Sequence, residues 1–250
     1  MKTIAFTTDL SGSDHLAFVH ACALAAASHA RLVTIHGNAP AELVSKLPDA
    51  APFAERWGVE IDHRRVCHEC CDDVRDTLLD AIQGIAPQLV ICGTSARRGF
   101  AALVRGSIAA ALARNLEMPA LILPNDSVGF VDEATGHLTL RTLLVPAGSR
   151  AEAVRGVAAA RAFAELAGRE LPIEIVHAGT DELDVADLGL PVLRPPGSIE
   201  AAIVAAAKQR PGSAIVMVTH GHDGVRDVLT GSHTEHVIRD GHVPVLSVHA

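Results

Sequence analysis

A glycine-containing stretch that ends in Gly106-Ser107 has the residue types and spacing of a phosphate-binding turn. It reads GTSARRGFAALVRGS and follows LVIC, a short apolar run typical of a buried strand. Glycines after a strand let backbone N–H groups approach an anion, and the free N–H groups at the start of a helix favour phosphate. Ser107 can also cap the helix that is expected to follow. Glycine after a strand often forms only a turn, so the pattern allows both interpretations.

Charged side chains close to this loop would suit a nucleotide. Asp9 ends the first apolar run of the chain, and a carboxylate at that place can accept hydrogen bonds from ribose hydroxyls. Ligands of parallel sheets lie outside the carboxyl ends of the strands, which would bring Asp9 beside the loop. Arg97 and Arg98 lie within the loop and either donate to phosphates or form a solvated tip.

Two other clusters contain metal-binding residue types. The first is CHECC, with thiols at Cys67, Cys70 and Cys71 and with His63 upstream. Zinc favours such ligands at short spacing, and neighbouring thiols also suit a redox pair. Structural zinc sites usually take their ligands from two separated pairs, and the chain has no second C-x-x-C. We therefore favour a strand-to-helix turn that tolerates cysteine, with metal binding or redox chemistry as the alternative.

The second cluster consists of histidines near the end of the chain, namely His220, His222, His233 and His236. The last two are three residues apart, which places them on one face of a helix. Together with Asp223 they could hold a metal ion. A polar loop that has lost a nucleotide site explains the same residues, and we favour that interpretation.

The two halves of the chain repeat each other. The sequence QLVICGTSARRGFAALVRGS, which starts at Gln88, aligns without a gap on SAIVMVTHGHDGVRDVLTGS, which starts at Ser213. The matches fall at turn and cap residues, where backbone geometry leaves few choices. We therefore predict one domain over residues 1–125 and a second over residues 138–250, joined by a polar, glycine-containing linker at residues 125–137.

Each half alternates short apolar runs with longer alanine-rich stretches, which predicts a doubly wound parallel sheet. His36 and His177 end the second strand of their halves, where a hydrogen-bonded structural role is expected. In the first half we expect strands at residues 3–8, 31–36, 59–66, 89–92 and 120–123, and helices at residues 14–29, 41–56, 72–86 and 107–115. In the second half, residues 180–196 are rich in Asp, Gly and Pro and hardly support the second helix, so this copy is expected to be trimmed.

The two loops, GTSARRGFAALVRGS and THGHDGVRDVLTGS, resemble the signature of the universal stress protein family. ATP-binding members of that family carry Gly-x2-Gly-x9-Gly-Ser/Thr after the fourth strand, an Asp at the end of the first strand and a Pro before the fifth. The resemblance covers both halves and implies a tandem universal stress protein. The fold that it implies is α/β, with two tandem doubly wound parallel five-stranded sheets of the Rossmann-like, adenine nucleotide α-hydrolase-like type. The positions that it assigns to nucleotide binding are Thr7, Asp9, Cys92, Gly93, Ala96, Arg97, Gly106, Ser107 and Ile108.

The sequence departs from the family pattern at several of these positions. Ala96 replaces the second glycine of the first loop, and Thr7 stands where the family has a proline. In the second copy, Val218 replaces the first glycine and Gly148 stands where the first copy has Asp9. Val218 is stiff and no carboxylate remains for a ribose, so we expect the second site to be degenerate.

The composition excludes several classes of function. The chain has 250 residues, and its 21 basic and 29 acidic residues give a net charge of −8, which disfavours contact with nucleic-acid phosphates. Six Phe, one Trp and no Tyr leave few side chains for base stacking. No apolar stretch is long enough to span a membrane, and no export signal is visible. We expect a cytoplasmic protein with neither a nucleic-acid nor a membrane partner.

The resulting hypothesis is a stress-response regulatory protein that binds ATP, or AMP or ADP, in its first domain. The chain has no G-x-S-x-G elbow, no Walker A lysine and no paired carboxylates, so we expect at most slow ATP hydrolysis. Two alternatives stay open: a tandem scaffold that binds no nucleotide, and a metal-binding or hydrolytic protein that uses the histidines of the second domain. Because family members commonly dimerise through strand five, we expect an intramolecular pseudo-dimer through residues 119–123 and 244–248, with a homodimer as an open question.

Overall fold

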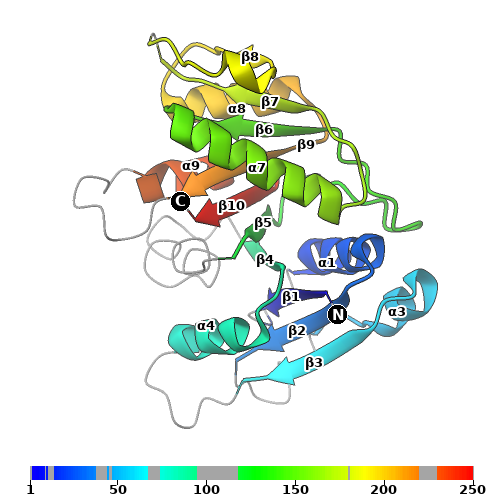
Figure 1. The fold of residues 1–250 in the computed structure, drawn as a ribbon. Helices are drawn as coiled ribbons and strands as arrows, with labels where there is room; N and C mark the ends of the chain where they lie inside the picture. Colours follow the sequence, from blue (N-terminus) through cyan, green and yellow to red (C-terminus); the bar gives the residue numbers. More distant parts are fainter. Residues whose placement is uncertain are drawn as a thin grey trace.

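A single sheet of ten strands runs through the whole molecule, in the order β3-β2-β1-β4-β5-β10-β9-β6-β7-β8 (Figure 1). The computed structural model describes residues 2–8, 10, 14–37, 44, 47–66, 74–94, 118–179, 181–219 and 230–249. The first-half strands are β1 (Thr3–Thr8), β2 (Arg31–His36), β3 (Ile61–Arg65), β4 (Leu89–Thr94) and β5 (Ala120–Pro124). The second-half strands are β6 (Thr142–Pro146), β7 (Ile173–Val176), β8 (Val192–Leu193), β9 (Ser213–Thr219) and β10 (Val245–His249).

The sheet is parallel within each half and antiparallel where the halves meet. Strands β5 and β10 pair in opposite directions, with Leu121 opposite Leu246 and Ile122 opposite Val245. These are the apolar last strands whose pairing the sequence led us to expect. The two expected five-stranded units are therefore fused into one mostly parallel sheet, with β3 and β8 at its edges.

Helices cover both faces of the sheet, because alternate residues of each buried strand point to opposite sides. The helices are α1 (His15–Ser28), α3 (Ala51–Trp57), α4 (Val74–Ile85), α7 (Arg150–Leu166), α8 (Ile199–Gln209) and α9 (Thr230–Gly241). Helices α1, α3 and α7 pack on one face, on a core that includes Ile4 and Phe6 of β1. Helices α4, α8 and α9 pack on the other face, on a core that includes Ala5.

Two of the sequence expectations about helices have clear outcomes. The single helix expected at residues 41–56 is wrong, because residues 47–50 are not helical and α3 begins only at Ala51. Pro48 explains the difference, since it lacks an N–H donor and pushes the residue before it out of the helical region. The trimming of the second copy is confirmed: between β7 and β8, the described residues hold only one short 3₁₀ turn, Ala186–Leu188.

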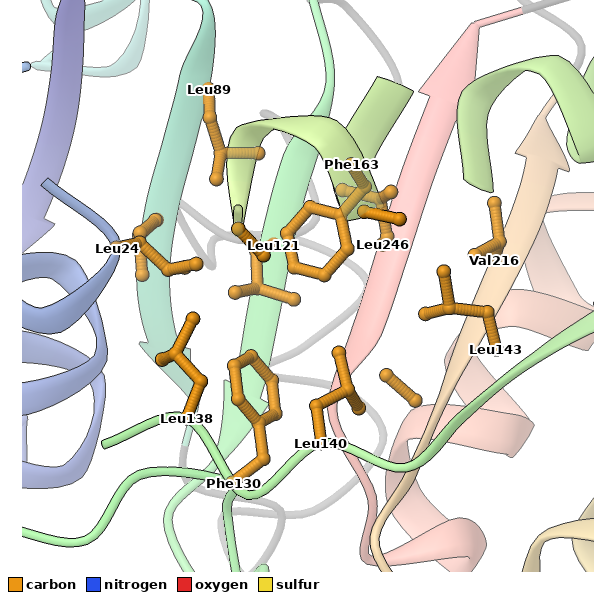
Figure 2. Close-up of a cluster of buried hydrophobic side chains, with 14 of the residues drawn as sticks. Leu24, Leu89, Leu121, Phe130, Leu138, Leu140, Leu143, Phe163, Val216 and Leu246 are labelled. Carbon is orange, nitrogen blue, oxygen red and sulfur yellow. The ribbon is translucent and has the colours of Figure 1, made fainter. Parts of the chain in front are cut away.

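Side chains from both halves form one apolar cluster across the junction of β5 and β10. Phe163 of α7 lies between Leu121 and Leu246, and Phe130 lies on the same face (Figure 2). The rings of Phe130 and Phe163 meet edge to face, with centroids 6.3 Å apart. The second-half helix therefore packs directly against a first-half strand.

The segment expected as a polar linker is docked against the first half. The backbone N–H of Phe130 donates to Nε2 of His20 at 2.7 Å, and Nδ1 of His20 donates to the carbonyl of Leu16 at 2.7 Å. The His20 ring also meets the Phe130 ring edge to face, at 4.6 Å between centroids. His20 thus holds the connecting segment on helix α1.

Two glycines in helices should respond to alanine substitution with opposite signs. At Gly156 of α7 an added Cβ would collide with Cγ1 of Val145, so helix and strand would have to move apart. We expect Gly156→Ala to lower the free energy of unfolding by about 1–3 kcal/mol. Gly84 of α4 has no atom within 4 Å of such a Cβ, so Gly84→Ala should raise it by about 0.5 kcal/mol. Urea denaturation of both variants measures the difference, and an unchanged stability of Gly156→Ala would contradict the close approach.

None of the helices in the described part of the chain combines the length and apolar character needed to cross a bilayer.

Candidate functional site

The carboxyl ends of β1 and β4 lie side by side at the point where the chain changes direction across the first half. Strand β1 pairs with β2 on one side and with β4 on the other, and Thr7 lies opposite Cys92. The chain leaves β1 toward β2 but leaves β4 toward β5, so the connections diverge here. This switch point is where open α/β sheets bind their ligands.

A buried carboxylate lies at this place. Asp14 is only 6% exposed, and the Thr8 hydroxyl donates a hydrogen bond of 2.5 Å to its Oδ2. Asp14 precedes α1, yet its side chain makes no cap hydrogen bond to the helix. The carboxylate is instead turned toward the end of β1.

Leu10 also contacts this end of the sheet. Oγ1 of Thr8 also accepts a hydrogen bond of 2.9 Å from the N–H of Leu10. Leu10 has a φ of 58°, in the left-handed region that a non-glycine residue enters only at a cost. Strained backbone of this kind concentrates at functional sites, because the surrounding contacts must enforce it.

The end of β4 shares the same small space. A Cβ built on Gly93 would lie 2.8 Å from Oδ1 of Asp14 and 3.0 Å from Oδ1 of Asn125, so no side chain fits there. Oδ1 of Asn125 is buried and has no hydrogen-bond partner among the described residues. A carboxylate and an amide oxygen therefore converge beside Gly93, and both are hydrogen-bond acceptors.

Neighbouring polar groups are unsuited to nucleophilic chemistry. Burial, together with the nearby Asp14 carboxylate, raises the pKa of the Cys92 thiol well above its usual value. This thiol stays protonated and inert at neutral pH. On the adjacent strand, Thr7 is buried and its Oγ1 has no partner among the described residues.

The structure describes three of the residues predicted for nucleotide binding: Thr7, Cys92 and Gly93 lie together at this edge of the sheet. The other predicted residues lie outside the described part of the chain, and these are Asp9, Ala96, Arg97, Gly106, Ser107 and Ile108.

Sequence reasoning missed three polar residues of this site. Asp14 and Asn125 supply its acceptor oxygens, and Thr8 donates to Asp14; all three lie at the end of a strand or at the start of a helix. Their position next to strand ends and a helix start was the available signal.

At the corresponding strand end in the second half, a glutamate side chain occupies the backbone N–H groups. Only residues 147–149 separate β6 from α7, and Oε2 of Glu152 accepts hydrogen bonds from the N–H groups of Gly148 (2.7 Å) and Ser149 (3.2 Å). Ser149 accepts in turn from the N–H of Glu152, which completes a capping box. A carboxylate thus occupies the backbone donors at this strand end.

The histidine cluster of the second half is only partly described. Nδ1 of His233 lies 2.5 Å from Oε1 of Glu200, so this histidine joins α9 to α8. His220, His222 and Asp223 lie outside the described residues, as do Cys67, Cys70 and Cys71. Among the residues that the structure describes, no group of three or more His, Cys, Asp or Glu side chains could hold a metal ion.

The sequence profile of the universal stress protein family matches residues 1–124 and 192–249. The chain belongs to the universal stress protein family. The two matched regions lie in the first and second halves of the sheet, as expected for a tandem member. No curated protein matches the sequence significantly.

Solved structures share the fold of this universal stress protein over almost its whole length. A universal stress protein from Archaeoglobus fulgidus DSM 4304 superimposes with a TM-score of 0.70 at 18% identity, covering 99% of this chain and 96% of that one. A functionally unknown protein from Pseudomonas aeruginosa PAO1 does so with a TM-score of 0.70 at 16% identity, covering 100% and 92%. The architecture is therefore found in other chains with both halves present.

Proposed function

We propose that this universal stress protein binds one adenine nucleotide, ATP, in its first half and acts as a stress-response regulator. The observation that carries the proposal is the group of acceptor oxygens beside Gly93, at the switch point between β1 and β4. A ribose presents two neighbouring hydroxyl donors, and buried acceptors without partners favour such a ligand. The buried Oδ1 of Asn125 is an acceptor of this kind.

The remaining contacts follow from the sequence pattern. Asp9 directly follows β1 and adds a carboxylate for the ribose, while Gly106-Ser107 offers backbone N–H groups to the phosphates. The site thereby separates acceptors, which suit hydroxyls, from donors, which suit phosphates. ATP carries both groups in one molecule.

The second half is proposed to bind no nucleotide. The Glu152 carboxylate already accepts from the N–H groups of Gly148 and Ser149, and like charge would repel a phosphate there. Val218 and Gly148 in place of the family residues support the same proposal.

Binding without efficient catalysis fits the groups described at the first site. The Cys92 thiol is held protonated by burial, which removes it as a nucleophile. The protein is therefore proposed to hold or sense ATP, with any hydrolysis slow and incidental to regulation.

Calorimetric titration with ATP tests the proposal. We expect one nucleotide per chain, and we expect Asp9→Ala to weaken binding by about 1.5–3 kcal/mol, because a charged hydrogen bond is lost. Gly106→Val should weaken binding further, since a branched side chain would fill the phosphate approach. Gly231 aligns with Gly106 in the sequence repeat, so Gly231→Val is the matched control in the second half and should leave the affinity unchanged.

Three results would contradict this assignment. A stoichiometry of two would mean that the second site also binds, and sensitivity to Gly231 rather than Gly106 would place the site in the other half. No binding by the unmutated protein would favour a tandem scaffold, with Ala96 as the residue that blocks the loop.

A further inference from the structure

Two histidines on neighbouring strands face each other at the first-half edge of the sheet. His36 ends β2 and His63 lies in β3, and their rings stack with centroids 4.9 Å apart and an angle of 19° between planes. Their Nε2 atoms are 3.0 Å apart. The ATP site described above uses neither imidazole.

The other nitrogen of each ring is held by a hydrogen bond. Nδ1 of His36 donates to the carbonyl of Gly37 at 2.5 Å, which leaves its Nε2 as an acceptor. Nδ1 of His63 lies 2.7 Å from Oγ1 of Thr34, and the same hydroxyl donates to the carbonyl of Asp62 at 3.2 Å.

The Thr34 hydroxyl allows His63 to take either tautomer. When Nε2 of His63 carries the proton, it donates to His36, and Nδ1 accepts from Thr34. When Nδ1 carries the proton, it donates to Thr34, whose own hydrogen goes to Asp62. In the second state both Nε2 atoms, 3.0 Å apart, carry a lone pair, and every ring N–H keeps a partner.

We propose that His36 and His63 bind a divalent transition-metal ion of the zinc class between their Nε2 atoms. Metal-ligating histidines almost always donate their second ring N–H to a carbonyl or a similar acceptor, as these two do. Tetrahedral zinc with bonds of about 2.0–2.1 Å sets its ligand nitrogens about 3.3 Å apart. The observed 3.0 Å therefore has to widen by only about 0.3 Å.

The exposure of His63 allows an ion to reach the histidine pair. His36 is only 1% exposed, whereas His63 is exposed and opens the pair to solvent. Partial burial and the neighbouring His36 lower the pKa of His63, against an opposing effect of Asp62. The proposed site supplies two imidazole ligands, and water molecules complete the coordination of the ion.

The second half supplies a matched control. His177 occupies the position of His36, but its Nδ1 lies 2.8 Å from the carbonyl of Ala147 and its Nε2 lies 3.0 Å from the carbonyl of Asp181. Both nitrogens face carbonyl oxygens, so neither is open to a metal ion. The proposal therefore applies to one half only.

The experiment is a zinc titration of the chelator-treated full chain against a competing chromophoric indicator. We expect one ion per chain, with the affinity reduced at least about tenfold in His63→Gln and in His36→Gln. Thr34→Val removes the hydroxyl that orients His63 and should also cost about tenfold. His177→Gln should bind zinc like the unmutated chain. Because His63 is exposed, His63→Gln keeps the test valid if the buried His36→Gln fails to fold.

Specific results would overturn the proposal. No binding up to millimolar zinc, or an unchanged affinity of His63→Gln, would exclude the pair as the site. Loss of binding on joint replacement of Cys67, Cys70 and Cys71 by serine, with His63→Gln unaffected, would move the ion to the thiols. The titration needs no nucleotide, so its outcome is independent of the ATP proposal.

Discussion

Phe163→Ala should lower the free energy of unfolding by about 3–5 kcal/mol, the largest effect that we expect from a single core substitution. The Phe163 side chain is 4% exposed and packs where β5 meets β10. Leu121, Leu246 and Phe130 surround the ring, so its removal leaves a cavity that rigid sheet strands cannot close (Figure 2). The substitution therefore removes packing at the junction between the two halves.

Thermal and urea denaturation measure this effect. In a chain of this size the melting temperature should fall by about 2–4 °C for each kcal/mol lost. Val128→Ala is the control, since Val128 is 95% exposed and should change the stability by less than about 0.5 kcal/mol. A Phe163→Ala protein that melts like Val128→Ala would show that the junction does not depend on this ring.

Acidification should destabilise the protein through His20. Desolvation lowers the pKa of His20 from 6.5 to about 4, because its ring is buried and already satisfied in the neutral form. The unfolded chain binds a proton below pH 6.5, whereas the folded chain resists it until about pH 4. This contribution to stability is present above pH 6.5 and is lost as the pH falls between those values, by up to about 3 kcal/mol.

The pH dependence of urea denaturation tests this expectation in His20→Gln. We expect the variant to be less stable at neutral pH and to lose less stability toward pH 4 than the unmutated chain. The control is His15→Gln, because His15 is exposed and its ion pair with Glu133 lies at the surface. An NMR titration of the unmutated protein gives an independent check: a His20 resonance that titrates near its ordinary value would contradict the expected shift.

The sequence was sufficient to predict the bounds of the strands that are buried on both faces. The expected bounds of β1 and β2 agree with the structure, because their apolar runs end at clear polar or glycine boundaries. The helix expected at residues 41–56 was wrong, because Pro48 lies inside that range and the described helix begins only at Ala51. The backbone restriction imposed by proline was the stronger determinant of where this helix begins.

The candidate sites were harder to predict from the sequence than the strands, because they depend on contacts between elements that are distant in the sequence. The Thr8 hydroxyl joins the Asp14 carboxylate to the backbone of Leu10, whose φ is 58°, and no periodicity of the sequence reveals this contact. His36 was interpreted as a structural residue, and its contact with His63 depends on the register that sets Thr34 beside His63. Pairing register is a property of two strands together, so the sequence of one strand alone does not determine it.

The antiparallel pairing of β5 with β10 has a consequence for how the two halves can diverge. When two identical chains associate, every substitution appears on both sides of the interface, so neither side can specialise. In a fused chain each half mutates independently while the covalent connection keeps its partner present at any dilution. Glu152 can therefore accept from the backbone N–H groups at one strand end while Asp14 and Asn125 keep the other strand end polar, in line with the ligand site that we propose for the first half alone.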